Sequence, residues 1–242
     1  YSSRHNHELC YAVSDRPDGG YRFGGTLVDI GDVFLDGRDE AHATNYLGNT
    51  HGGMLHLGED FYIFYHRQTN GHWYSRQGCA EPVYFDAEGK IAQVEITSCG
   101  LNGGPLKGEG TYPAYIACNL FTEEHALMAG KPGAPRVTQD GRDDDKEPGY
   151  ITDIVAGTTM GFKYFDCKGV RAFAIETRGY GNGTFEIKTS WDGEPLASIR
   201  IAYTDQWERY ETALNLPDGV HAIYLTYTGG GRTALKSISL IK

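Results

Sequence analysis

Hydrophobic and polar residues alternate with the period of a β-strand in the last third of the chain. Phe185 and Ile187 alternate with Glu186 and Lys188. The same alternation places further hydrophobic residues on one strand face: Ile199, Ile201, Tyr203, Ile223, Leu225, Tyr227, Ile238 and Leu240. Half-buried antiparallel strands at this spacing are typical of a two-sheet sandwich, and about 90 residues are enough for its core. Residues 150–242 are therefore predicted to form an antiparallel β-sandwich of the jelly-roll type.

The hydrophobic runs and turn residues of 1–102 predict short strands separated by turns, and no helical period is present. The run from Phe61 to Tyr65 is apolar on both faces, which predicts a strand buried between neighbouring sheets. Four-stranded units of roughly 40–45 residues give two propeller blades in this length. Two blades cannot close a ring, so we expect further blades before Tyr1. The predicted strands are 8–14, 21–30, 52–57, 61–67, 72–76, 82–86 and 91–98.

Residues 103–149 are rich in glycine, proline and charge, which indicates a linker. One apolar island at 112–121 interrupts it, and so many apolar side chains favour packing against a flanking domain. The run Asp143, Asp144 and Asp145 is interpreted as a solvated stretch, because it lacks the regular spacing of a calcium loop.

Composition and charge narrow the classes of partner. The chain has 242 residues and a net charge of -10, so a phosphate backbone would be repelled and nucleic acid is excluded as a partner. No stretch approaches the ~18 apolar residues of a membrane span, and no secretion leader precedes the first strand. A soluble chain is expected. The 17 tyrosines favour neutral polar ligands such as sugars.

Five cysteines are scattered along the chain without C-x-x-C spacing. An odd number in this pattern specifies neither a zinc knuckle nor a complete disulfide framework. Mostly buried free thiols are expected, with a bridge between Cys79 and Cys99 as the alternative. The cysteines are Cys10, Cys79, Cys99, Cys118 and Cys167.

A series of motifs, in order, resembles the last blades of glycoside hydrolase family 43, a family of five-bladed β-propellers, which implies that residues 1–102 are about two blades of such a propeller. These motifs are H-E-L-C-Y-A at 7–12, N-Y-L-G-N-T-H-G-G-M at 45–54, Y-I-F-Y-H-R-Q-T-N at 62–70, S-R-Q-G-C-A-E-P at 75–82 and V-E-I-T-S-C-G-L-N-G-G-P-L at 94–106. Residues 150–242, with G-F-K-Y-F-D at 161–166 and G-V-H-A-I-Y-L at 219–225, are similar to the sandwich of carbohydrate-binding module family 6.

The resemblance implies inverting hydrolysis of arabinose- and xylose-containing plant polysaccharides by an arabinofuranosidase or xylosidase. In this mechanism a carboxylate base activates water while a carboxylic acid protonates the leaving oxygen. In the family, the base, the acid and a modulating aspartate come from the first three blades, and none has a matching position here. A secreted or periplasmic full-length protein is expected. The alternatives are a free-standing, non-catalytic carbohydrate-binding protein and a structural remnant that only packs.

Two residues of the first segment match positions of the family's central channel and sugar site. His51, in N-T-H-G-G, matches a channel histidine that helps to hold a structural calcium, and its alternative is a core histidine without an ion. Arg76 matches an arginine that contacts the sugar, and a strand-surface salt bridge is its alternative. His66 and Arg67 are weaker candidates for the edge of the same sugar-contacting site.

Other histidines and carboxylates receive no functional assignment. His5 and His7 share one strand face, as metal ligands could, but the sequence offers no third ligand, which favours exposed histidines. Nothing in the sequence sets the separation of any carboxylate pair, so none is assigned to catalysis. The carboxylates considered are Asp29, Asp32, Glu81 and Glu95.

Aromatic residues of the sandwich are candidates for stacking on sugar rings. Trp191 and Tyr180 lie in predicted turns, where exposure is expected. Trp207 matches the core tryptophan of the module family, which favours a buried structural position.

Overall fold

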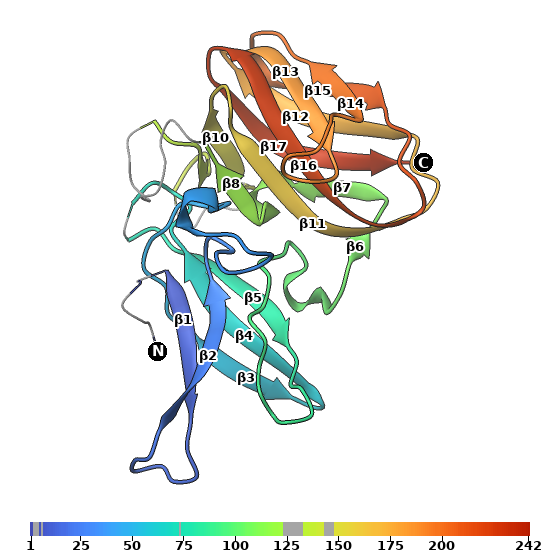
Figure 1. Cartoon of the computed structure of the whole chain (residues 1–242). Coiled ribbons are helices and arrows are strands. Elements are labelled where there is room, and N and C mark those ends of the chain that lie inside the picture. The colour runs from blue at the N-terminus through green and yellow to red at the C-terminus, as the bar shows by residue number, and fades with distance from the viewer. Residues whose placement is uncertain (2–4, 6, 73, 123–132, 143–147) are drawn as a thin grey trace. The chain divides into compact units, whose positions relative to one another are not determined.

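The strand pattern is confirmed by the computed structural model, which is all-β and divides into two compact units (Figure 1). The structure describes residues 1, 5, 7–72, 74–122, 133–142 and 148–242. Within these residues the first unit is Tyr1–Ile96, and the second holds Thr97 and the residues after it. None of the helices in the described part has the length and apolar character needed to cross a bilayer.

The first unit contains a two-stranded and a three-stranded antiparallel sheet. In the two-stranded sheet β1 pairs with β2, and in the three-stranded sheet β4 lies between β3 and β5. Both sheets join strands that are neighbours in the sequence. The elements are β1 (Glu8–Val13), β2 (Arg22–Asp29), the 3-10 helix η1 (Glu40–His42), β3 (Gly53–Leu57), β4 (Asp60–Arg67) and β5 (Gln77–Val83).

Three of the predicted strands in this unit are wrong. The strand expected at 82–86 lies at Gln77–Val83 instead, as β5. Residues 72–76, of which residue 73 lies outside the described part, form a turn because the amide of Ser75 donates to the carbonyl of His72. Residues 91–98 make only single bridges, Ile91 to Phe85 and Val94 to Val28. Hydrophobic residues there are buried without a continuous ladder, so their spacing imitates a strand.

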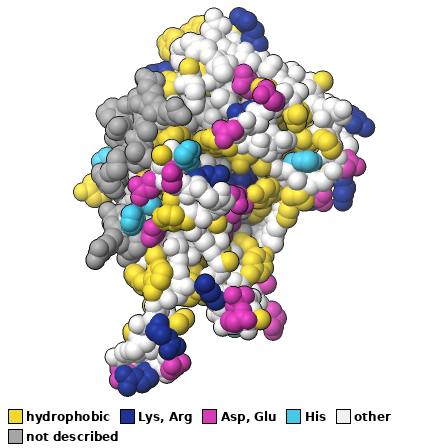
Figure 2. Space-filling model, in the orientation of Figure 1, with side chains coloured by type: hydrophobic (Ala, Val, Ile, Leu, Met, Phe, Trp, Pro, Cys, Tyr) yellow, Lys and Arg dark blue, Asp and Glu magenta, His cyan; other side chains and the backbone are white. Residues whose placement is uncertain are grey.

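The run from Phe61 to Tyr65 forms the central strand β4, but only one of its faces is buried. Ile63 and Tyr65 are 1% and 3% exposed, whereas Phe64 is 37% exposed. In the described residues nothing buries Phe64 fully, and Figure 2 shows hydrophobic side chains reaching the surface of this unit. The expected burial on both sides is therefore not found.

The second unit is a β-sandwich, as the alternation predicts. Its elements are η2 (Gly100–Asn102), β6 (Leu106–Lys107), β7 (Gly110–Pro113), η3 (Ala114–Ile116), β8 (Asn119–Phe121), β9 (Arg136–Thr138), β10 (Tyr150–Ile154), β11 (Thr159–Cys167), β12 (Ala172–Gly179), β13 (Asn182–Lys188), β14 (Ala197–Arg200), β15 (Thr204–Ala213), β16 (Gly219–Gly230) and β17 (Thr233–Ile241).

Two six-stranded sheets form this sandwich, and the chain passes back and forth between them. One sheet has the order β15-β12-β17-β10-β9, with β7 also on β17. The other has the order β14-β13-β16-β11-β6, with β8 also on β11. The core between them is rich in aromatic residues, and its fully buried side chains include Phe162, Phe165, Phe173, Phe185 and Tyr227.

Tyr203 departs from the predicted alternation. It was expected on the buried face with Ile199 and Ile201, which are 3% and 2% exposed, but Tyr203 itself is 57% exposed. Strand β14 ends at Arg200, and residues 201–203 are not in a strand. The two-residue period therefore no longer governs which way the Tyr203 side chain faces.

The segment 103–149, expected as a linker, provides four strands of the sandwich. Backbone hydrogen bonding joins β7 to β17, β6 and β8 to β11, and β9 to β10. The predicted packing of its apolar island is found in the core, to which Ala114, Ala117 and Leu120 belong. The run at residues 143–145 lies outside the described residues. Because its strands have only two to four residues, the segment shows no strand period in the sequence.

The cysteines are free thiols, as the sequence predicts. Cys10, Cys118 and Cys167 are buried, and Cys79 and Cys99 are partly buried. The alternative bridge between Cys79 and Cys99 is not formed.

Truncation of Leu120 in β8 tests whether this segment belongs to the sandwich. Leu120 is 4% exposed in the core, so Leu120→Ala is expected to destabilise the second unit by about 2–5 kcal/mol. Urea unfolding, with hydrogen exchange to assign the change to the second unit, measures the effect. The control Leu101→Ala removes a side chain that is 61% exposed and is expected to change little. Equal, small effects of both substitutions would show that the segment only lies on the surface.

Candidate functional site

Arg76 lies between two histidines of the first unit, so three of the four candidate residues of this segment lie together. Its Nη1 atom lies 2.9 Å from Nε2 of His51 and 3.1 Å from Nε2 of His66. The two imidazole rings meet edge to face, with centroids 4.5 Å apart. Arg76 and His51 are exposed, whereas His66 is 7% exposed. The three side chains form a polar cluster that reaches the surface of the unit, here called the Arg76 cluster.

Strands β4 and β5 set the positions of His66 and Arg76. His66 lies near the end of β4, where it pairs with Gly78 of β5, and Arg76 immediately precedes β5. Arg67, the other candidate for the edge of the sugar-contacting site, points elsewhere. Its side chain is 5% exposed and donates to Oδ1 of Asn45 at 3.0 Å, as expected when successive side chains of a strand face opposite ways.

His51 is held against β4 by the motif that contains it. The hydroxyl of Thr50 donates to the carbonyl of His66 at 2.9 Å, and Nε2 of Gln68 donates to the carbonyl of Asn49 at 2.7 Å. Gly52 allows this close approach, because a Cβ at that position would overlap the carbonyl oxygen of Phe64. The next glycine has open space around it, so only the first glycine of the pair is required for packing.

Both imidazoles accept a hydrogen bond from Arg76, so both must be uncharged at Nε2. The Nδ1–H group of His66 then donates to the carbonyl of His51 at 3.2 Å, which fixes its tautomer. Burial, the positive charge of Arg76 and the neighbouring His51 lower the pKa of His66 below its ordinary value. A guanidinium presented between two neutral rings can donate to sugar hydroxyls.

The described side chains around His51 include few of the oxygen ligands that calcium prefers. Calcium prefers about six to eight oxygen ligands, and His51 offers a nitrogen that already accepts from the cationic Arg76. Among the described residues, the His, Cys, Asp and Glu side chains close enough to share a metal do not include His51. Calcium near His51 stays a prediction, and a contact through the water molecules of the ion would suit the imidazole better than a direct bond.

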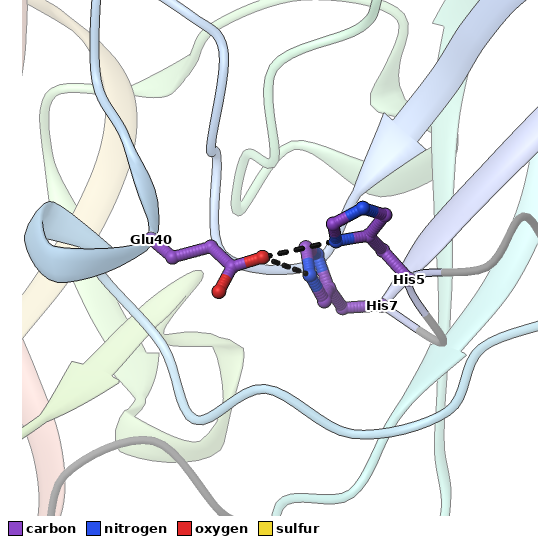
Figure 3. Close-up of side chains that lie close together, drawn as sticks. All are labelled: His5, His7 and Glu40. Atoms are coloured by element: carbon purple, nitrogen blue, oxygen red, sulfur yellow. Dashed lines mark hydrogen bonds and ion pairs between the residues drawn. The ribbon is translucent and has the colours of Figure 1, made fainter.

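His5 and His7 are not the pair of exposed histidines that the sequence favours. His7 is 6% exposed, and Glu40 supplies the third potential ligand that the sequence did not reveal (Figure 3). Burial alone would lower the pKa of His7, but hydrogen bonds and charge from Asp29 and Glu40 raise it above its ordinary value. Because Glu40 is 33 residues away in the sequence, no local spacing could have indicated it.

The buried carboxylates of the first unit have structural partners. Asp29 accepts from His7 and from the amides of Gly31 and Val33. Asp32 accepts from the amide of Ile96 at 2.9 Å, and Glu81 accepts from the hydroxyl of Tyr65 at 3.3 Å. Each of the three buried carboxylates therefore accepts at least one hydrogen bond within its own unit.

The structure does not bring together the aromatic candidates of the sandwich. Tyr180 is 76% exposed and stacks on Tyr203, with centroids 5.0 Å apart and an interplanar angle of 20°. Trp191 is half-buried and meets Tyr224 edge to face at 6.0 Å. Tyr180 and Trp191 flank opposite ends of the seven-residue strand β13, which spans about 20 Å, so they cannot contact one sugar ring together.

Trp207 is outside the hydrophobic core, contrary to the expectation for this position. It is half-buried in β15, and the guanidinium of Arg178 lies 4.4 Å from its ring centroid. Arg178 also donates to Asp140 at 2.8 Å. A cationic side chain therefore covers this ring, which makes Trp207 a weaker platform for sugar than Tyr180.

Comparisons with known proteins agree with the motifs. No family model matches the chain. The chain is 47% identical, over 99% of its length, to a xylosidase/arabinosidase of Thermoclostridium stercorarium and spans 52% of that protein. Its fold is similar to that of a family 43 arabinoxylan arabinofuranohydrolase from Bacillus subtilis, with a TM-score of 0.54 and 19% sequence identity. This similarity covers 98% of the present chain and 48% of the arabinofuranohydrolase. A family 6 carbohydrate-binding module from Clostridium stercorarium gives a TM-score of 0.47 and 15% identity, covering 58% of this chain and 98% of that module.

These similarities confirm the resemblance to glycoside hydrolase family 43. The chain spans about half the length of the xylosidase/arabinosidase and of the arabinoxylan arabinofuranohydrolase.

Protonation of His66 is expected to destabilise the first unit. Its folded-state pKa lies below the ordinary value of 6.5, so the unfolded state takes up the proton first as the pH falls. Stability from the neutral ring is complete above pH 6.5 and declines below it. His66→Gln is expected to flatten this decline in urea unfolding, while the control His56→Gln, on β3, retains it. Parallel pH curves for the wild type and His66→Gln would contradict the prediction.

Proposed function

We propose that this chain is part of a glycoside hydrolase of the family 43 type that acts on arabinose- and xylose-containing plant polysaccharides by inverting hydrolysis. In this proposal the first unit supplies two propeller blades with sugar-contacting residues, and the second is a carbohydrate-binding sandwich. The whole protein would act outside the cytoplasm, secreted or in the periplasm, where such polysaccharides occur. The observation that carries the proposal is the Arg76 cluster, in which three motif residues meet at the surface of the first unit.

The Arg76 cluster suits a neutral sugar better than a charged ligand. Arg76 has a planar fork of donors, and it is exposed while His66 beneath it is buried. Two hydroxyls on adjacent sugar carbons can accept from such a fork. The imidazole of His51, also exposed, lies beside it at hydrogen-bond distance and limits where the ring can sit.

Exposed hydrophobic residues of the first unit support further blades as its partner. A hollow of about 610 Å³ is lined by Leu9, Tyr11, Met54 and other residues of β1–β4. Its lining includes Phe23 and Tyr21, which are 67% and 62% exposed. Contiguous apolar surface of this kind marks an interaction site, and a propeller blade packs on its neighbour through such a face.

The catalytic carboxylates are proposed to lie outside this chain. The buried carboxylates Asp29, Asp32 and Glu81 accept hydrogen bonds within their own unit. The donors are His7, Ile96 and Tyr65, respectively, and not residues of the Arg76 cluster. General acid catalysis and general base catalysis each typically accelerate a reaction by about 10²- to 10⁴-fold. A chain without the acid and the base lacks both contributions to the rate.

We therefore expect this chain alone not to hydrolyse an aryl α-L-arabinofuranoside or an aryl β-D-xyloside. Release of the aryl group, followed by absorbance against a buffer blank, measures this. Turnover that survives re-purification and disappears in Asp32→Asn or Glu81→Gln would overturn this division of roles. It would leave the sugar-binding role of the sandwich untouched.

Tyr180 supports carbohydrate as the ligand of the sandwich. Its ring is 76% exposed and is braced from one side by Tyr203, so the opposite face is presented without a large loss of side-chain freedom on binding. Arabinoxylan or arabinan oligosaccharides are the proposed ligands. The same observation favours the alternative function, a free-standing non-catalytic carbohydrate-binding protein.

Binding of arabinoxylan oligosaccharides to the chain, measured by isothermal titration calorimetry, tests the sandwich. Tyr180→Ala is expected to weaken binding by about 10-fold, equivalent to about 1.4 kcal/mol, because the stacking face is lost. Tyr84→Ala removes a tyrosine of the first unit that is 70% exposed and serves as the matched control. Absence of binding, or equal affinity in both variants, would contradict a sugar site at Tyr180.

The hydrolase and the free-standing carbohydrate-binding protein predict different activities for a longer protein that contains further propeller blades. If the chain is part of a hydrolase, a longer protein that supplies the remaining blades hydrolyses the aryl pentosides, and Arg76→Ala lowers its kcat/KM. If the chain is only a binding protein, it binds oligosaccharide equally well without them, and the longer protein gives no turnover either.

A further inference from the structure

Three potential metal ligands converge at the start of the chain, away from the Arg76 cluster in sequence. His5 and His7 come immediately before β1, and Glu40 opens the 3-10 helix η1. Oε1 of Glu40 lies 3.0 Å from Nδ1 of His5 and 3.3 Å from Nε2 of His7. All three donor atoms lie within 4.8 Å of one another, and Figure 3 shows both rings directed toward the carboxylate.

A buried carboxylate fixes the orientation of His7. Nδ1 of His7 lies 2.6 Å from Oδ2 of Asp29, which is fully buried. The other oxygen of Asp29 accepts from the amides of Gly31 at 2.9 Å and Val33 at 3.2 Å, so the carboxylate itself cannot rotate. Nδ1 of His7 therefore carries a proton, and Nε2 is the atom turned toward Glu40. Histidines that bind metals are commonly held in this way by a carboxylate behind them.

The spacing of the donors suits a four-coordinate ion. Zinc bonds of about 2.0–2.2 Å in a tetrahedron place neighbouring ligand atoms about 3.3 Å apart, close to the two separations from Glu40. Three protein ligands leave one position for water. A metal ion would replace the proton on Nε2 of His7. The ion would lie between Glu40 and the two rings, and these side chains would have to move only slightly to make room for it.

Ligand type and charge indicate which ion fits. Two imidazole nitrogens and one carboxylate favour zinc and its first-row neighbours over calcium, which prefers oxygen ligands. Asp29 and Glu40 together bring two negative charges to this site, so a dication balances them. The side chains of His5 and Glu40 are 54% and 51% exposed, which gives an ion a path from solution, while that of His7 is 8% exposed.

We propose that His5, His7 and Glu40 bind a divalent first-row transition-metal ion, zinc by ligand type, with Asp29 orienting His7. The ion would tie the residues before β1 to the segment around η1. Because only the folded chain presents all three ligands together, binding would stabilise the first unit. This site is separate from the sugar-binding role and does not depend on it.

Zinc titration of the whole chain tests the proposal, after removal of any affinity tag and treatment with a chelator. One zinc ion per chain is expected to bind with micromolar or tighter affinity in calorimetry and to raise the melting temperature. Cobalt is expected to give the visible absorption bands of a four-coordinate ion. Calcium is expected to change neither the heat signal nor the melting temperature.

The variants separate this site from adventitious binding. Glu40→Gln and His5→Ala alter exposed side chains and are expected to keep the fold but weaken zinc binding at least 10-fold and abolish the cobalt bands. His42→Ala is the matched control, because His42 belongs to the same helix η1 and pairs with Asp39 instead. Zinc binding that is absent in the wild type, or unchanged in Glu40→Gln and His5→Ala, would overturn the proposal.

Discussion

The position of Arg76 depends on two uncharged imidazole rings. A guanidinium has donors only, so it can lie at hydrogen-bond distance from His51 and His66 only while each ring offers a lone pair. A proton on either ring would replace an attraction by a repulsion between two cations at about 3 Å. The orientation of the arginine, and with it the set of donors that a sugar can meet, follows from the neutrality of its neighbours.

Sequence reasoning found the residues of this cluster but not their arrangement. His51, His66 and Arg76 could be selected because each lies in a motif that resembles family 43. The motif does not state that one guanidinium nitrogen contacts both rings, since that contact is made by side chains 10 and 25 residues apart. The calcium prediction at His51 has the same basis: the motif indicates a family position, but it does not indicate which donors surround it.

The fold was predictable where strands are long and one face is buried. The alternation around Phe185 and Ile187 predicts β13 well, because each side chain of a regular strand faces either the core or solvent. Short strands such as β6 and β8 carry too few residues to show a period, so their segment looked like a linker. Glu40 was missed because only the tertiary fold brings η1 beside the residues before β1.

The place of β17 in its sheet has a consequence for biosynthesis. β17 lies between β12 and β10 and also pairs with β7, more than a hundred residues earlier in the chain. During translation β7, β10 and β12 emerge from the ribosome first and must wait, with their inner edges unpaired, for the strand that joins them. The sandwich thus cannot close progressively from its N-terminal side. Its assembly is a late, cooperative step, and the nascent chain depends on remaining soluble until β17 has left the ribosomal tunnel.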